Sequence, residues 1–103
     1  MYQNQTSFLK SLPALPNGIL ESKILIHELR FPLSGGNGEP FKVKIWLDIH
    51  GQYSAICNKY ANSNSLADML KGTKSSNLND TIQKALKLIE GYQECGTTPF
   101  EHY

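Results

Sequence analysis

The stretch Phe41-Lys42-Val43-Lys44-Ile45-Trp46-Leu47-Asp48-Ile49 alternates apolar and polar residues without a break. Because the side chains of a β-strand point alternately to opposite faces, this pattern predicts a strand with one apolar and one polar face. The apolar face holds Phe41, Val43, Ile45, Leu47 and Ile49, and the polar face holds Lys42, Lys44, Trp46 and Asp48. We therefore expect the first set to form the core and the second set to face water.

Two further strands are predicted beside this one. Residues 19–31 form an extended run that Pro32 ends, and residues 53–60 alternate more weakly. The first run is apolar on both faces at 24–26, which is typical of a central or helix-covered strand. Its faces are expected to hold Leu25, His27, Leu29 and Phe31 on one side and Ile24, Ile26, Glu28 and Arg30 on the other. The glycine-rich segment 34–40 and the turn 50–52 suit hairpin connections, so the three strands form an antiparallel meander.

Helices are predicted only after the strands. Residues 66–70 form a short helix that Gly72 stops, and residues 78–89 carry an apolar stripe at helical spacing. Asn77 is a suitable N-cap for the longer helix, and Gly91 is a suitable C-cap. With these helices on one face of the sheet, the fold class is α+β, in two layers: a three-stranded antiparallel meander with C-terminal helices packed on one face.

Length and composition favour one domain over residues 1–103. Pro13 and Pro16 make residues 1–18 an irregular lead-in, and residues 93–103 are expected to form a loosely ordered tail. No apolar run approaches the ~18–20 residues of a membrane span, and the N-terminus lacks the pattern of a secretory signal. We therefore expect a cytoplasmic protein, with Cys57 as a core thiol and Cys95 as a free thiol; a bridge between them is the alternative if the protein is exported.

The polar face of the central strand is the predicted interaction face. It carries Lys42, Lys44 and Trp46, the only tryptophan of the chain, and His50 follows at its end. Tryptophan is enriched at protein interfaces, so a partner protein or a second copy of this chain is the favoured occupant, although ordinary packing would also place an indole there. Nucleic acid is the alternative partner, because aromatic residues on a sheet stack bases while lysines follow phosphates. The formal net charge of +1 offers no overall attraction to nucleic acid or membrane.

No residue set predicts catalysis, a metal or a cofactor. Asp48 and His50 lie two residues apart, a spacing that can chelate, but no other ligand accompanies them with zinc-site spacing. Cys57 and His27 would form a nucleophile–base pair only if their strands were neighbours. We expect a non-catalytic protein-interaction module, homodimeric or with another partner, of the kind found among small bacterial or phage accessory proteins. A nucleic-acid-binding module is the first alternative, and a small enzyme of unknown reaction is the second.

One resemblance to a known family involves a hairpin followed by a helix. The residues Asp48-Ile49-His50-Gly51-Gln52-Tyr53-Ser54-Ala55 have the form D-x-x-G-x-Y-x-A and precede a helix containing Ala85-Leu86-Lys87-Leu88-Ile89. This order resembles HicB-type antitoxins of bacterial toxin–antitoxin pairs over half of the chain. Residues 62–77 replace the proline-glycine segment usual in that family, and no DNA-binding part is recognisable after the helix. We therefore assign no family on this basis.

Overall fold

The computed structural model describes residues 3–14, 16–17, 22–34, 39–61 and 65–103. Along the chain the elements are α1 (Gln3–Lys10), β1 (Lys23–Phe31), β2 (Phe41–Asp48), β3 (Tyr53–Cys57), β4 (Lys59–Tyr60), α2 (Leu66–Gly72), α3 (Leu78–Lys87), α4 (Tyr92–Cys95) and β5 (Thr98–Pro99). None of the described helices has the length and apolar character needed to cross a membrane.

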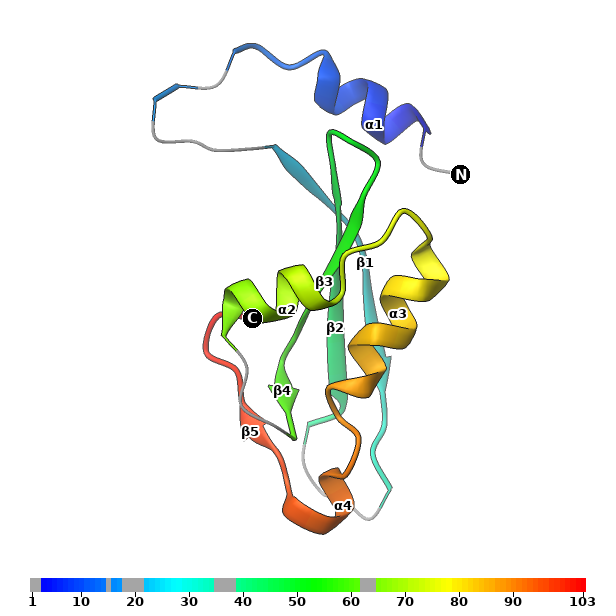
Figure 1. Ribbon diagram of the computed structural model, residues 1–103, viewed down its shortest axis with the longest axis vertical. Helices are drawn as coiled ribbons and strands as arrows, with labels where there is room; N and C mark the ends of the chain where they lie inside the picture. The colour runs from blue at the N-terminus through cyan, green and yellow to red at the C-terminus, as the bar shows by residue number, and fades with distance from the viewer. Residues whose placement is uncertain (1–2, 15, 18–21, 35–38, 62–64) are drawn as a thin grey trace.

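The predicted α+β meander is confirmed. The strands β1, β2 and β3 form an antiparallel sheet in that order, and α2 and α3 both contact β3 (Figure 1). Met69 of α2 and Ala85 of α3 are fully buried in one cluster with the apolar side chains of β2, so both helices lie on the same face of the sheet. The opposite face is not covered by these two helices.

The alternation of β2 is confirmed from Phe41 to Leu47, but Ile49, expected in the core, lies half-buried in the turn because the strand ends at Asp48. Phe41, Val43, Ile45 and Leu47 expose at most 1% of their surface, while Lys42, Lys44 and Trp46 are half-buried. Asp48, expected on the wet face, is instead buried because it builds the turn into β3. Its Oδ1 atom accepts the backbone N–H groups of His50 at 2.8 Å and Gln52 at 2.9 Å, and Gly51 supplies the φ of 76° that the turn requires.

The predicted faces of β1 are wrong in its first half, because the strand contains a β-bulge. Leu25 pairs with Trp46 but His27 pairs with Ile45, so Ile26 is an extra residue between them. This insertion places Leu25 beside Trp46 and on the same face as Glu28 and Arg30. The strand also lies at a sheet edge, not at the centre, and its predicted residues 19–21 fall outside the described part.

The helix signals are confirmed at the N-terminal ends. Ser65 and Asp68 form a reciprocal capping box at the start of α2, and the Asn77 side chain accepts the N–H of Asp80 at 3.1 Å at the start of α3. The C-terminal prediction for α3 is wrong by a few residues. The helix ends at Lys87, and Gly91, with a left-handed φ of 82°, lies just before α4.

Side chains and backbone of the α2–α3 loop protect the outer edge of β3. Thr73 Oγ1 accepts the N–H of Ala55 at 2.8 Å and donates to the carbonyl of Met69 at 2.6 Å. Ser75 and Tyr53 exchange two backbone hydrogen bonds of 2.7 and 3.0 Å. The outward N–H groups of Tyr53 and Ala55 are therefore paired inside the chain, which protects this part of the edge from strand addition.

The two ends of the chain contain more regular structure than expected. The lead-in contains the regular helix α1, whose Leu9 is 3% exposed, and α1 contacts β1 and β2. In the tail, β5 pairs with β4 and the Phe100 N–H donates to Asn58 at 2.8 Å (Figure 1). Phe100 is 7% exposed within the core cluster, so the burial of its ring holds the segment expected to be loose.

Candidate interaction face

The structure brings three of the four predicted site residues together. Lys42, Lys44 and Trp46 lie on the face of β2 opposite α2 and α3, while His50 is exposed in the turn that follows β2. We call this surface the open face and define it by Leu25, Lys42, Lys44, Trp46 and Tyr103. Leu25 reaches it through the β-bulge of β1, and Tyr103 reaches it from the tail.

Both lysines of the open face have partners within the chain. Lys42 Nζ lies 3.3 Å from a carboxylate oxygen of Glu39, and Lys44 Nζ lies 4.3 Å from the centre of the Tyr103 ring. The second contact is a cation–π interaction, which holds the end of the described chain against the sheet. The tail showed no sequence pattern that would have placed Tyr103 here.

Tyr103 is the one titratable side chain of the open face with a strongly shifted pKa. Burial of its phenol, followed by the proximity of the Glu28 carboxylate, raises the pKa of Tyr103 to about 12. Both effects penalise the phenolate more than the neutral phenol. The ring is therefore an uncharged, half-buried part of the surface at neutral pH.

Trp46 combines a partly exposed ring with a buried polar atom. The indole Nε1 has no hydrogen-bond partner among the described residues, although a buried donor is normally satisfied. Its cross-strand neighbours are Leu25 on β1 and Ser54 on β3, and Leu25 is 42% exposed. The centre of the open face is therefore exposed on its β1 side, at Leu25, and buried on its β3 side, where Ser54 is 6% exposed.

A small basic hollow lies next to this face at the edge of β3. It measures about 230 Å³ and its charged lining consists of Lys23, Lys71, Lys74 and Asp48. The ammonium of Lys74 lies 4.0 Å from the Asp48 carboxylate, so one positive charge is partly compensated. Sequence analysis missed this cluster because its lysines come from β1, α2 and the following loop.

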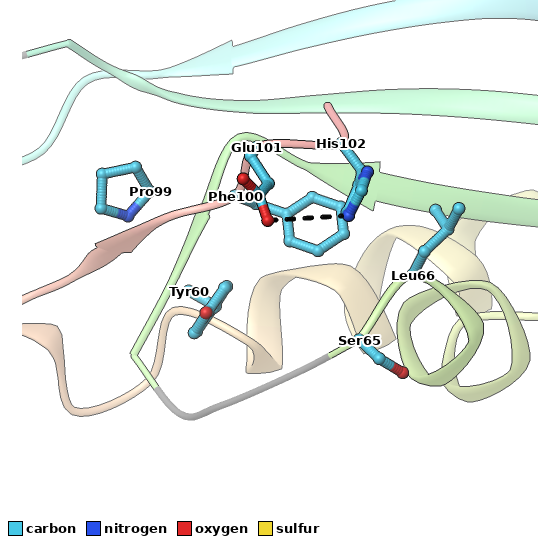
Figure 2. A pocket seen from close by; sticks show the side chains of 7 residues that line it. All are labelled: Tyr60, Ser65, Leu66, Pro99, Phe100, Glu101 and His102. Carbon is cyan, nitrogen blue, oxygen red and sulfur yellow. Dashed lines mark ion pairs between the residues drawn. The ribbon is translucent and has the colours of Figure 1, made fainter.

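A larger pocket of about 500 Å³ opens between β4, β5 and the start of α2. Figure 2 shows its lining, which consists of Tyr60, Ser65, Leu66, Pro99, Phe100, Glu101 and His102. The rings of Tyr60 and Phe100 meet edge-on at 6.1 Å, and His102 Nε2 lies 3.8 Å from the Glu101 carboxylate. Ser65, His102 and Glu101 all line this pocket, but the Ser65 hydroxyl caps α2, where it accepts the N–H of Asp68 at 3.1 Å, and it points away from His102 (Figure 2).

The conceivable catalytic pair is not brought together. Cys57 pairs with Val43 and His27 pairs with Ile45, so β2 separates the two strands that carry them. Burial raises the pKa of the Cys57 thiol to about 12, and its Sγ lies 3.9 Å from the Ala85 carbonyl as a packed core group. Cys57 and Cys95 are both free thiols, and the described residues contain no group of three metal-ligating side chains.

Comparison with known protein families, curated proteins and solved structures found no match to this chain. What the protein does therefore has to be argued from its own residues.

Proposed function

We propose that this chain is a small, non-catalytic protein-interaction module that binds its partner through the open face. Lys42, Lys44, Trp46 and the nearby His50 would contact the partner, with Leu25 beside the indole. The proposal includes a cytoplasmic location and a role of the bacterial or phage accessory type. The two unpaired thiols support a reducing compartment.

The observation that carries the proposal is the incomplete cover at the centre of the open face. A leucine with 42% of its surface exposed lies opposite the only tryptophan, whose indole N–H is buried without a partner. Apolar surface left in contact with water costs about 25 cal/mol per Å², so a partner that covers Leu25 would be bound favourably. A protein that covers this centre would bury Leu25 and contact the indole ring, while the flanking lysines supply the polar rim of an interface.

A nucleic-acid-binding module is the second candidate, and the basic hollow favours it. Lys23, Lys71 and Lys74 converge there from three parts of the chain, which concentrates positive charge that the overall balance of +1 conceals. Binding by this route predicts an oligonucleotide gel shift that disappears in the double variant Lys71→Glu, Lys74→Glu. The double variant Lys42→Glu, Lys44→Glu tests the open face in the same assay. An absence of any shift at low salt removes this candidate.

The interaction module is tested by comparing two leucines of similar exposure. Leu25, in the open face, is 42% exposed, and Leu66, at the start of α2, is 37% exposed. Leu25→Lys adds a charge at the centre of the proposed interface, whereas Leu66→Lys makes the same change elsewhere. Both variants and the wild type serve as baits in an extract of the native cell, with captured proteins identified by mass spectrometry.

We expect the wild type and Leu66→Lys to capture the same protein and Leu25→Lys to lose it. Titration of the purified partner should then shift the emission of Trp46, which is the only indole in the chain. Equal capture by all three baits, or an unchanged Trp46 emission on binding, would place the contact elsewhere and remove the open face from the proposal.

A further inference from the structure

Among the described residues, no strand pairs with the outer edge of β1 in the three-stranded sheet. Polar backbone groups of alternate residues point to opposite sides of a strand. In β2, the N–H groups of Lys42 and Asp48 bond to Asn58 and Gln52, on the β3 side, so the intervening odd-numbered residues point toward β1. Their register partners on β1 include Leu29, so the backbone groups of Glu28 and Arg30 point away from the sheet. No described segment pairs with this edge.

Two features limit how far a further strand can pair along β1. The β-bulge between Leu25 and His27 interrupts the regular register, and Pro32, which has no N–H, follows the strand. Regular pairing is therefore confined to residues 27–31, and its midpoint is Leu29. An antiparallel two-fold pairing that uses the whole segment must be centred on that residue.

This register makes the edge complementary to itself in charge. With Leu29 on the two-fold axis, Glu28 of one copy lies opposite Arg30 of the other, and the pair occurs twice. Within one chain the Arg30 guanidinium already lies 3.6 Å from the Glu28 carboxylate. Four charges of alternating sign would then surround the axis, and opposite charges across a strand pair are stabilising.

We infer that two copies of this chain associate through β1 in antiparallel fashion, forming one continuous six-stranded sheet. The proposed function does not require a second copy of the chain, whereas this association does. It rests on the proposed function only in treating the chain as an interaction module. Glu28 and Arg30 contribute their outward N–H and C=O groups to the new ladder. Leu29 and Phe31, which are half-buried, gain apolar cover from the second copy.

Sedimentation of the full chain over micromolar to submillimolar concentrations tests this association. The wild type should approach twice the 11.5 kDa mass of one chain. Glu28→Arg and Arg30→Glu each place like charges opposite one another, and each should weaken association about tenfold or more. An equimolar mixture of the two variants restores opposite charges across the axis and should dimerise, as should the double variant E28R/R30E.

Amide exchange provides a readout that does not depend on the charges. The N–H groups of Glu28 and Arg30 should exchange quickly at low concentration and slowly at high concentration, while that of Leu29 stays protected by β2 throughout. A wild type that remains monomeric overturns the inference, as does a dimer in which these two amides stay fast. Neither result affects the capture experiment with Leu25→Lys, so failure here and failure of the proposed function can be told apart.

Discussion

Thr73→Val is predicted to destabilise the fold although it replaces one β-branched residue by another of nearly the same shape. Thr73 is 1% exposed, and its hydroxyl is the acceptor for the N–H of Ala55, itself fully buried at the outer edge of β3. The valine variant leaves that amide unpaired, which costs about 1–3 kcal/mol, and also removes the bond to Met69. We therefore expect a loss of about 2–3 kcal/mol in the free energy of unfolding.

Thr73→Ser is the matched control because it keeps the hydroxyl and loses one methyl group, at about 1 kcal/mol. Urea unfolding followed by Trp46 emission should give similar m-values and a midpoint order of wild type, serine, valine. In a domain of this size the valine variant should also melt about 10 °C below the wild type. If the valine variant proves as stable as the serine variant, the hydroxyl does not satisfy the edge and the reasoning is wrong.

Three further predictions concern the core and the tail. Phe100→Ala should lose about 3–5 kcal/mol of unfolding free energy in a denaturant titration, because a core ring is removed; a loss below 1 kcal/mol would contradict its buried position. A thiol reagent at pH 8 should modify Cys95 quickly and Cys57 only after unfolding, and two fast thiols would show that Cys57 is accessible. Tyr103 should ionise near pH 12 in an absorbance titration, a step absent from Tyr103→Phe. Because the pKa of Tyr103 in the folded chain lies above the ordinary value of 10, its contribution to the free energy of unfolding is complete below pH 10 and is lost as the pH rises through 12. A parallel loss of stability in the wild type and Tyr103→Phe over this range would refute the prediction.

Periodicity was sufficient to predict the meander and its helices. The alternation of residues 41–49 identifies the central strand, and Asn77 identifies the start of the longer helix, because these signals depend on neighbouring residues. The β-bulge left no such signal, since Ile24-Leu25-Ile26 is apolar throughout and one extra residue does not change that pattern. The error affects the proposed interface because it hid Leu25 from the open face.

Long-range contacts account for the other differences. The exception is Asp48, which is buried by a local turn: its carboxylate accepts the N–H groups of His50 and Gln52, two and four residues further along the chain. Tyr103 and Phe100 lie in a segment with no periodicity, and their positions depend on a sheet that is distant in sequence. The three lysines of the basic hollow likewise become neighbours only in the folded chain.

The burial of Phe100 among side chains of β2 and β3 has a consequence for synthesis on the ribosome. Translation is vectorial, so the strands emerge well before the ring that completes their packing. The nascent chain must therefore leave the apolar side of β2 partly open until the tail clears the exit tunnel. Slow elongation through the segment around Phe100 would prolong the interval in which a chaperone can bind this chain.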